Sequence, residues 1–509
     1  MTKPRRDVSI AIIGAGLGGI AAGVHAKLAG VSSLTIFEQS AGPGGTWWDN
    51  TYPGIECDIE ITYYSYSFAP REWKRTHASG SEIQAYVQSV IDEFGLAPHM
   101  RYGTRVEEAV WNDVEHFYTL TTAAGEKLRF DVVVSALGLL NYPRYPTWPG
   151  LDTFTGPKFH TARWEHQHDL SGKRVAVVGV GSTASQVVPA IAPVAGEVTL
   201  FVREPAYVMP KNERDFSDAD RLTRKAPWGR WRERFKLFLR FERAMSVRNP
   251  NSKMQRSARA AYASYRDRVF NNRPDLRALM SPDYPFACKR PILSTNFLPS
   301  LTRANVRVVP RAVVRVTEHA VVDDAGIEHP ADVLVMATGF QPWNFLSTLR
   351  LIGSRGRSIH GVWGDQPEAY LGLQVTGFPN FFMMYGPNTN FMCVTFMLER
   401  QAEYIARAIK RLQREDVTAI DVRHSIMDVY NRAVQRALSG NAIEGNCHSY
   451  YHTATGKNVV TWPWWSSVYF LLTRLGRFAQ TTRNAADERA PTHLPLDRST
   501  TRKLPEGSN

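Results

Sequence analysis

The stretch whose residue types point most directly to chemistry runs from Gly44 to Asp58, with the sequence GGTWWDNTYPGIECD. Adjacent glycines let a backbone approach a bound molecule closely, tryptophans can cover an apolar ring, and a Tyr-Pro-Gly turn fixes the direction of the chain. Gly-Gly-x-Trp taken alone could equally be a tight turn over a hydrophobic cluster. The whole string, which ends in the carboxylate of Asp58, predicts a loop that binds a cofactor.

A glycine-rich turn precedes this loop and has the residue order of a dinucleotide-binding unit. The apolar run from Val8 to Ile13 predicts a strand, residues 14–19 (GAGLGG) predict a helix start, and a second strand is predicted over 34–37. In such a unit the first glycine makes the turn, the second lets the backbone reach a diphosphate, and the third lets the helix pack closely. An acid after the second strand binds ribose hydroxyls. The predicted nucleotide-binding residues are Gly14, Gly16, Gly19 and Glu38.

The same arrangement recurs in the middle of the chain. A strand is predicted over 174–178, and residues 179–184 (GVGSTA) repeat the turn, with Ala184 at the third glycine position. The next predicted strand, 198–202, delivers Arg203 nineteen residues after Ala184, which is the offset that separates the acid from the last glycine in the first unit. The sequence therefore predicts a second dinucleotide site.

The residues at these matching positions differ in charge, and this difference predicts which nucleotide each unit binds. An acid such as Glu38 favours a free ribose 2′-hydroxyl, whereas an arginine such as Arg203 can pair with a 2′-phosphate. The first unit therefore suits FAD and the second suits NADPH. Glu204 places a carboxylate beside that phosphate, so the strictness of the preference for NADPH over NADH stays open.

Together these motifs resemble those of the Baeyer-Villiger monooxygenases, the flavoproteins that insert oxygen beside a ketone. The Gly44–Asp58 loop fills every fixed position of their fingerprint, Gly-Gly-x-Trp, four residues, Tyr/Phe-Pro-Gly, three residues and Asp. Residues 154–165 match a second signature, Phe-x-Gly-x-x-x-His-Thr-x-x-Trp-Pro, except that Glu165 replaces the proline. The resemblance spans residues 8 to about 475. It implies that His160 and Trp164 position the domains rather than take part in bond chemistry.

The resemblance implies a reaction in which NADPH reduces FAD, oxygen forms a C4a-peroxyflavin, and this species attacks a ketone to give an ester or lactone. It places Arg290 at the family's active-site arginine, with Asp58 to orient it, and Lys289 beside the NADPH phosphate. Residues implied at FAD are Gly45, Thr46, Trp47, Asp58, Tyr64 and Val106. Residues implied at NADPH are Gly179, Gly181, Ser182, Thr183, Gln186, Arg203, Lys289 and Tyr450. Phe391, Met392 and Cys393 would line the substrate side of the flavin, although a buried helix start is nearly as good an interpretation.

The predicted fold class is α/β, with two Rossmann-like dinucleotide-binding domains and a helical insertion in the second. The FAD-binding domain is expected over 1–150 and 340–483, and the NADPH-binding domain over 151–205 and 286–339. The helical insertion is expected over 206–285, and the polar residues 484–509 are expected to form a disordered tail.

The positive charge of the chain is concentrated in one element. The net charge is +13, and fifteen basic residues against three acidic ones lie between Arg221 and Arg268. Such localisation favours one basic element over a general nucleic-acid-binding surface. Large apolar residues recur in this segment at helical spacing: Trp228, Trp231, Phe235, Phe238, Phe241 and Met245. An apolar stripe that packs on the nucleotide domains is the favoured interpretation, and docking on an anionic membrane is the sharper alternative, with Trp462, Trp464 and Trp465 as a second contact.

The sequence leaves several rivals open. A related flavin monooxygenase that oxygenates nitrogen or sulfur is the nearest, followed by an uncoupled NADPH oxidase and a non-enzymatic membrane scaffold. The four cysteines, at positions 57, 288, 393 and 447, contain no Cys-x-x-Cys pair. This spacing disfavours a disulfide reductase or a metal motif and fits a reducing, cytoplasmic compartment. The substrate is expected to be a hydrophobic ketone, whose identity the sequence does not give, and no oligomeric state is predicted.

Overall fold

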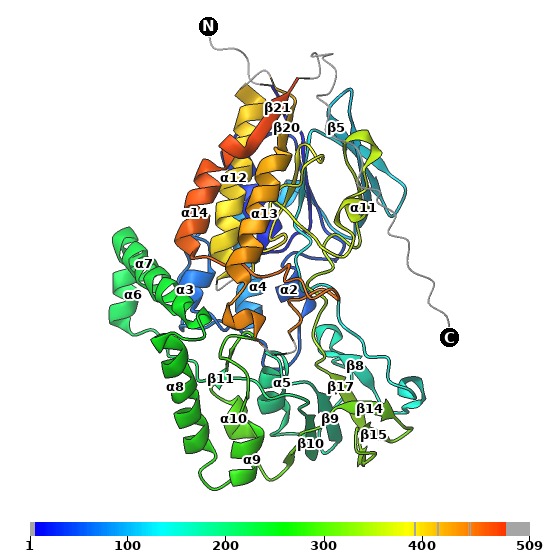
Figure 1. Cartoon of the computed structure of the whole chain (residues 1–509), viewed down its shortest axis with the longest axis vertical. Helices are drawn as coiled ribbons and strands as arrows, with labels where there is room; N and C mark the ends of the chain where they lie inside the picture. Colours follow the sequence, from blue (N-terminus) through cyan, green and yellow to red (C-terminus); the bar gives the residue numbers. More distant parts are fainter. Residues whose placement is uncertain (1–5, 391–392, 415–416, 446, 448, 485–509) are drawn as a thin grey trace, which may run out of the picture.

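The computed structural model describes residues 6–390, 393–414, 417–445, 447 and 449–484. In Figure 1 the chain forms two lobes, one above the other, and each contains a parallel sheet of five strands. The upper lobe combines N-terminal segments, drawn in blue, with C-terminal segments, drawn in yellow to red. The lower lobe consists of segments from the middle of the chain. This arrangement agrees with the predicted α/β fold.

The upper sheet begins the chain and receives its last strand from far downstream. Its strands are β1 (Ile10–Ile13), β2 (Leu34–Phe37), β3 (Met100–Arg101), β7 (Val132–Ser135) and β19 (Phe381–Met383), in the spatial order β19-β7-β1-β2-β3. Every residue of β1, β7 and β19 is buried, as expected for a parallel sheet that is covered on both faces. The main helices around it are α1 (Leu17–Leu28), α4 (Gly80–Glu93) and α12 (Val394–Arg414).

The lower sheet repeats this plan. Its strands are β8 (Lys158–His160), β9 (Arg174–Val178), β10 (Glu197–Phe201), β13 (Val306–Val309) and β17 (Val333–Met336), in the order β13-β10-β9-β17-β8. The helices α5 (Ala184–Ile191) and α10 (Phe297–Ser300) pack together beside it. A small antiparallel sheet follows, made of β14 (Val313–Val316), β15 (Ala320–Asp323) and β16 (Glu328–Pro330).

Smaller elements complete the upper lobe. Strands β4 (Val106–Asn112) and β5 (Phe117–Thr122) form an antiparallel hairpin, and the sheet gains β6 (Lys127–Phe130) and the parallel strand β18 (Arg350–Ile352). The short helices are α2 (Thr46–Asp49), α3 (Ile61–Tyr64) and α11 (Ile359–Trp363). Near the C-terminus lie β20 (Ala419–Val422), α13 (His424–Leu438), α14 (Ser466–Leu475) and β21 (Gln480–Arg483).

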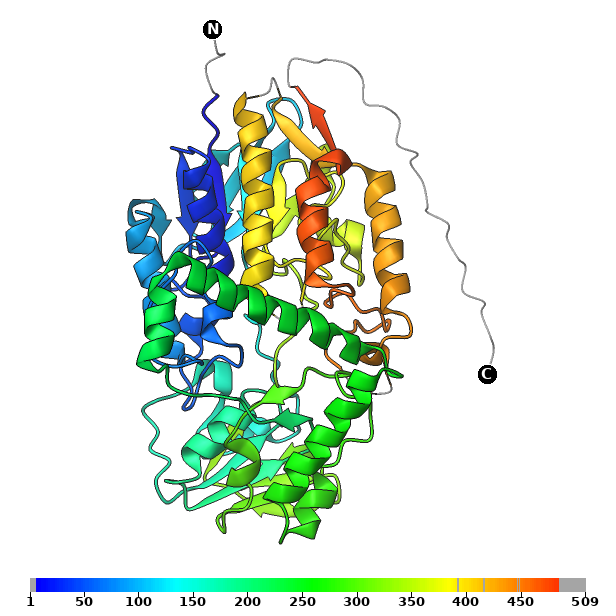
Figure 2. The same cartoon turned by 90° about the vertical axis from the view of Figure 1, so that its left-hand side faces the viewer.

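A helical insertion leaves the lower lobe after β11 (Val208–Met209) and returns at β12 (Ile292–Leu293), and these two strands pair in parallel. Its helices are α6 (Asp218–Lys225), α7 (Pro227–Ala244), α8 (Lys253–Val269) and α9 (Pro274–Leu279). Figure 2 shows α7, in green, crossing the front of the upper lobe at its lower margin, while α8 runs down the lower lobe. The insertion therefore contacts both lobes.

The predicted apolar stripe of α7 is divided between packing and exposure. Phe241 stacks on Tyr63 at 5.2 Å between ring centroids, and Phe238 lies 5.7 Å from the ring of Phe396. The preceding turns are exposed, with 68% of Trp228 and 51% of Trp231 accessible to solvent. The prediction of packing is therefore correct for the C-terminal half of the stripe only.

Two of the four cysteines form a disulfide, Cys288–Cys447, which joins residues 159 positions apart. This disulfide was not predicted because no local spacing in the sequence marks such a pair. Cys57 and Cys393 are free and buried. Within the described parts of the chain, no helix combines the length and the apolar character needed to cross a bilayer.

Candidate active site

The first glycine turn follows β1 and is packed too tightly for a side chain at Gly14 or Gly19. Gly14 has φ +106°, and a Cβ there would lie 2.6 Å from the carbonyl oxygen of Ala136 on the neighbouring chain segment. At Gly19 a Cβ would lie 1.8 Å from the Gly14 carbonyl oxygen, so this glycine lets α1 approach the turn. A Cβ at Gly45 would lie 3.0 Å from the Cα of Gly16, which shows that the Gly44–Asp58 loop is pressed onto the turn. The first two of these glycines thus shape the turn between β1 and α1.

Glu38 is buried at the end of β2 and is fixed by two backbone donors. Its Oε2 accepts from the Ala15 N–H and its Oε1 accepts from the Ser40 N–H, both at 2.8 Å. Because the first donor belongs to the glycine turn, the carboxylate is held at the cavity wall beside the place where the predicted ribose would lie.

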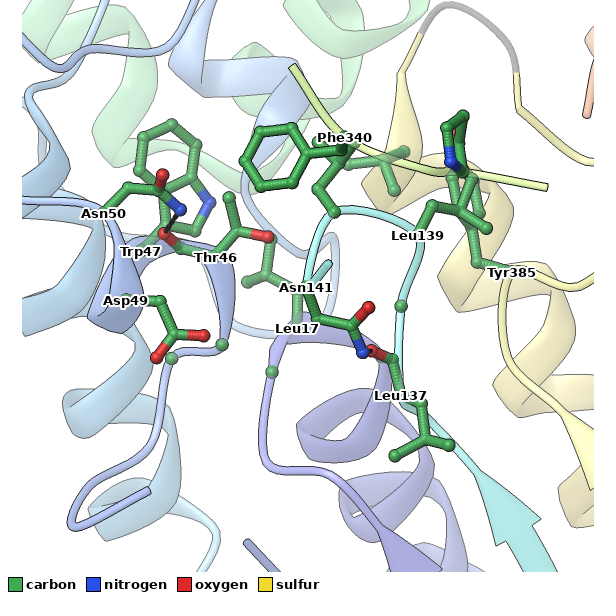
Figure 3. Close-up of a pocket in the computed structure, with 18 of the residues that line it drawn as sticks. Leu17, Thr46, Trp47, Asp49, Asn50, Leu137, Leu139, Asn141, Phe340 and Tyr385 are labelled. Atoms are coloured by element: carbon green, nitrogen blue, oxygen red, sulfur yellow. Dashed lines mark hydrogen bonds between the residues drawn. The ribbon is translucent and has the colours of Figure 1, made fainter. Parts of the chain in front are cut away.

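The start of the Gly44–Asp58 loop folds into the short helix α2. Trp47 donates from Nε1 to the Tyr64 hydroxyl at 3.1 Å, and the two rings meet edge to face at 5.8 Å. Asn50 donates from Nδ2 to the Thr46 carbonyl at 2.8 Å, as Figure 3 shows. These bonds fix one wall of the cavity, at which Thr46, Trp47 and Tyr64 lie together.

The end of the same loop is bonded to the lower lobe. The Tyr52 hydroxyl donates to Gln186 Oε1, and Gln186 Nε2 donates to the Glu56 carbonyl, each at 2.9 Å. Lys211, whose side chain is 1% exposed, forms an ion pair with the Glu56 carboxylate. Gln186 was predicted at NADPH and lines the cavity, but its side chain also joins the two lobes. The roles of Glu56 and Lys211 were missed because the partners lie far apart in sequence and belong to no motif.

The second glycine turn is as strained as the first but more open. Gly179 has φ +118°, and a Cβ there would lie 2.4 Å from the Ala337 carbonyl oxygen. A Cβ at Gly181 would meet no described heavy atom within 4 Å. The turn thus has the required backbone shape and leaves open space at the position where a diphosphate is expected.

The cations predicted to hold the NADPH phosphate lie near the end of β10. Arg203 is exposed, and the next residue, Glu204, forms an ion pair with Lys289. The structure therefore brings a carboxylate to one of the two predicted phosphate ligands. This pair fits the sequence-based expectation that Glu204 lies beside the phosphate.

Arg290 and Asp58 meet although 232 residues separate them. One terminal nitrogen of the guanidinium, Nη2, donates to both carboxylate oxygens at 2.8 Å. The negative charge of Asp58 raises the pKa of Arg290 above its already high value, so the guanidinium stays charged. Tyr450, from the C-terminal part of the chain, lines the same cavity. A fixed positive charge therefore faces the space between the two glycine turns.

Most of these residues surround one cavity of about 440 Å³, whereas the predicted residues Gly19, Gly179, Arg203 and Lys289 are not part of its lining. Figure 3 shows side chains from α1, from the α2 loop, from the segment after β7 and from Phe340 and Tyr385 around it. The predicted residues that line it are Gly14, Gly16, Glu38, Gly45, Thr46, Trp47, Asp58, Tyr64, Val106, Gly181, Ser182, Thr183, Gln186, Arg290 and Tyr450. The unpredicted apolar residues Leu137, Leu139 and Phe340 also line it.

Three predicted substrate-pocket residues have a different outcome. Phe391 and Met392 lie outside the described residues. Cys393 is buried beside the cavity lining rather than within it, because its thiol points to the Tyr63 carbonyl oxygen at 3.4 Å and to Thr395. The alternative interpretation, a buried helix start, describes Cys393 better, since α12 begins at the next residue.

His160 is buried at the end of β8 and is bonded on both sides of its ring. Nδ1 accepts from the Ala162 N–H at 3.1 Å, so Nε2 carries the proton and donates to the Gly339 carbonyl at 3.1 Å. Burial lowers the pKa of His160 to about 4, which keeps the ring neutral near pH 7. These bonds connect the end of β8 to the turn after β17, a position that suits the predicted structural role.

Comparisons with known proteins agree with this geometry. A family model described as flavin-binding monooxygenase-like matches residues 7–349. A Baeyer-Villiger monooxygenase of Streptomyces coelicolor is 37% identical over 472 residues, which cover 90% of this chain and 89% of the relative. Another Baeyer-Villiger monooxygenase, from Pseudomonas aeruginosa, is 34% identical and covers 92% of this chain and 90% of its own length.

Solved structures give the same result. An oxidised steroid monooxygenase bound to NADP superposes with a TM-score of 0.83 at 28% identity, and the match covers 94% of this chain and 99% of that one. Cyclohexanone monooxygenase from Rhodococcus sp. Phi1, bound to NADP⁺, gives a TM-score of 0.81 at 28% identity, covering 94% and 100%. The chain therefore belongs to the flavin-binding monooxygenase-like family. The predicted fold class and the predicted resemblance to Baeyer-Villiger monooxygenases are both confirmed.

Proposed function

We propose that the cavity between the two lobes is the active site of a Baeyer-Villiger oxidation, with Arg290 and Asp58 as its catalytic pair. The enzyme uses FAD and NADPH and inserts one atom of O₂ beside a ketone carbonyl to give an ester or lactone. The observation that carries this proposal is the Arg290–Asp58 ion pair, which lines a cavity that both glycine turns also line.

The residues present fit the two nucleotides. The first turn offers glycines at the positions where a Cβ would collide with backbone, and a fixed carboxylate, Glu38, suits ribose hydroxyls. The second turn offers open space at Gly181 and two basic residues, Arg203 and Lys289, for a 2′-phosphate. We therefore assign FAD to residues 1–150 and 340–483, and NADPH to 151–205 and 286–339, with 206–285 as the insertion.

The bound flavin supplies the redox chemistry that activates oxygen, and the protein supplies charge and shape. Oxygen transfer to a ketone passes through species that carry negative charge on oxygen. The Arg290 guanidinium is positioned to stabilise that charge, and its protonation does not change over the physiological pH range. Asp58 holds the guanidinium through Nη2 and leaves the remaining N–H donors for the reacting oxygen.

The walls of the cavity favour an apolar substrate. Leu137, Leu139 and Phe340 line it together with Trp47, and they can exclude water from the reacting atoms. We therefore propose a hydrophobic ketone as the substrate.

The direct test is a panel of cyclic, linear and aryl ketones incubated with the FAD-loaded enzyme and NADPH. A gain of 16 daltons in the product, with ester or lactone formed per NADPH oxidised, supports the proposal. Amine and thioether substrates belong in the same panel. Oxygenation of these alone would instead favour the nitrogen- or sulfur-oxygenating rival, and hydrogen peroxide without any oxygenated product would favour an NADPH oxidase.

We also propose that the protein is cytoplasmic and docks on anionic lipid through α7. Trp228, Trp231 and Phe235 follow each other at helical spacing and form a stacked row, with ring centroids 4.8 and 5.2 Å apart. All three are exposed, and Leu239 continues the row one turn further. An exposed row of this kind on a helix surface matches the apolar face of helices that lie in a membrane interface.

Cations flank this row in the arrangement that anionic lipid requires. Arg232, Lys236 and Arg243 are exposed on α7, and lipid headgroups of negative charge attract such residues by about 1 kcal/mol each. Helix α14, which carries the exposed residues Leu471 and Leu475, lies on the same side of the molecule as α7 in Figure 2. Together these features favour a lipid surface, in which the apolar row can insert while the flanking cations contact the headgroups.

Sedimentation with lipid vesicles tests this docking. Vesicles that contain phosphatidylserine should pellet the enzyme at low salt, and Trp228→Ser with Trp231→Ser should leave it in the supernatant. Val114→Ser, at a site 77% exposed in the upper lobe, is the matched control and should still pellet. If the parent enzyme stays in solution with every vesicle, the exposed row has another role.

A further inference from the structure

A disulfide joins the two segments that carry Arg290 and Tyr450. Cys288 lies two residues before Arg290 and is fully buried, whereas Cys447 lies three residues before Tyr450 and is half-buried. Arg290 and Tyr450 both line the cavity. The bond therefore joins the segment that carries a proposed catalytic residue of the lower lobe to the segment that carries an aromatic residue from the C-terminal part of the chain.

Hydrogen bonds between Glu444 and residues up to Asn458 hold the segment that carries Tyr450. His452 bonds to Glu444 at 3.0 Å, Asn458 donates to the same carboxylate at 2.9 Å, and both partners belong to this segment. Gly445 packs against the bridge itself, because a Cβ there would lie 3.2 Å from the Cys288 sulfur. The internal bonds fix how the segment folds, and the disulfide fixes where it lies relative to Arg290.

We propose that the Cys288–Cys447 disulfide is a reversible positioning device for coenzyme binding. When it is closed, it holds Tyr450 at the cavity wall on the same side as Arg290. When it is open, the segment that carries Tyr450 is released from the lower lobe and the coenzyme side of the cavity loses one wall. The inference rests on the proposed function, because it assigns that side of the cavity to NADPH. Disulfides inside cells are usually transient, so reversibility agrees with the proposed cytoplasmic location.

The bond can close and open by balanced steps. On closing, a hydroperoxide takes two electrons: one cysteine thiolate attacks its oxygen to form a sulfenic acid, and the second thiol displaces water and completes the disulfide. With hydrogen peroxide, two thiols and one peroxide give one disulfide and two waters. On opening, one thiol of a dithiol reductant attacks the sulfur of the half-buried Cys447, and Cys288 leaves as the thiol. The second thiol of the reductant then displaces Cys447 as a thiol, and the reductant becomes a disulfide.

The test uses the FAD-loaded enzyme in two forms, one treated with hydrogen peroxide and one with dithiothreitol, each then desalted. Titration of thiols in denaturant should find two in the oxidised form, Cys57 and Cys393, and four in the reduced form. The dissociation constant for NADPH is measured from the reduction of the flavin in the absence of oxygen. It should be about two- to tenfold higher in the dithiothreitol-treated form, because NADPH must then order one loop and one aromatic ring on binding. The FAD content and the limiting reduction rate should not change.

Cys447→Ser is the main variant because Cys447 is only half-buried. It should behave like the reduced enzyme and should respond to neither reagent, whereas the parent enzyme should recover after reoxidation. Four thiols after peroxide treatment, or equal NADPH affinity in the two forms of the parent, would overturn the proposal. Since the flavin reduction is measured without a ketone, failure to form ester would count against the proposed function and not against the disulfide.

Discussion

The two glycine turns are built alike but hold their surroundings in different ways. Each begins with a glycine at positive φ, Gly14 or Gly179, whose missing side chain lets the turn contact the carbonyl of an adjacent segment. In the first unit the Gly44–Asp58 loop is pressed onto Gly16, while in the second unit Gly181 faces open space. The first site is covered by its own chain, as suits a cofactor that stays, and the second is open, as suits a coenzyme that must enter and leave.

The charged residues that follow β2 and β10 also differ in how firmly they are held. Glu38 is buried and held by two backbone N–H groups, so it is already in place before a nucleotide arrives. Arg203 is exposed, and Lys289 is paired with Glu204, so a phosphate must compete with that carboxylate. A preformed site and a site that must rearrange can thus be built from one supersecondary unit.

The largest effect should come from filling the first turn. Gly19→Ala puts a Cβ 1.8 Å from a backbone oxygen. This clash can be relieved only if α1 moves, so the variant should lose FAD or fail to fold. The matched change Gly181→Ala has open space and should keep FAD, while its NADPH affinity falls. Flavin absorbance per polypeptide measures the first effect. Equal FAD content in both variants would remove the distinction between a closed and an open turn.

The next largest effect should come from the pair that bridges the two units. Arg290→Ala removes a donor aimed at developing charge, which commonly costs about 2.7 to 4 kcal/mol, or roughly a hundred- to thousandfold in rate. FAD should stay bound, and consumed NADPH should be diverted to hydrogen peroxide. Asp58→Ala should act in the same direction but less completely, because the guanidinium loses only its orienting partner.

The measurement is ester formed per NADPH oxidised. Arg290→Lys is the control that keeps the charge but not the planar fork, and it should fall between the parent and Arg290→Ala. Ester formation by Arg290→Ala at the rate and coupling of the parent would contradict the catalytic assignment.

A smaller effect is expected on coenzyme choice. Arg203→Ala removes a charge-assisted bond of about 1.5 to 3 kcal/mol and should raise the Michaelis constant for NADPH roughly ten- to hundredfold, with little change for NADH. Glu204→Gln, which keeps the size of the side chain but not its charge, should lower the constant for NADPH. Equal changes in the Michaelis constants for NADPH and NADH would show that neither residue distinguishes the 2′-phosphate from a free hydroxyl.

The last effect concerns stability rather than activity and arises at His160, which joins the end of β8 to the turn after β17. His160 titrates near 6.5 when unfolded and at about 4 when folded, so the unfolded chain binds more protons between these values. Stability should therefore fall as pH decreases from 6.5 toward 4, by up to about 3 kcal/mol from this residue. His160→Gln should be less stable than the parent at pH 7, and the difference in urea midpoint should shrink at pH 5. A constant difference would exclude His160 as the source.

The sequence predicted the elements with strong local signals and missed those set by distant contacts. β2 and β9 have the predicted bounds because short apolar runs end at a charge or a glycine. The meeting of Arg290 and Asp58 followed from family resemblance, since no local pattern relates residues 232 positions apart. The pairing of β18 with β4 was missed for the same reason.

Residues with two possible environments were the hardest to predict. Trp228 and Phe241 have the same helical periodicity, yet one is exposed and the other is packed on Tyr63. The difference arises because only the C-terminal half of α7 packs on the upper lobe, which only the tertiary structure reveals. Cys447 likewise gives no sign in the sequence of its partner Cys288.

The origin of the strands has a consequence for how the chain acquires its shape during synthesis. All strands of the lower sheet lie between residues 158 and 336, whereas the upper sheet needs β19, which pairs with β7 only after residue 383 has been made. Sheet pairings between distant segments form slowly, and domains fold as units while the chain emerges. The sheet of the lower lobe can therefore be complete while β7 still has an unpaired edge, so the nascent chain passes through a stage in which the lower sheet exists before the upper sheet can be completed.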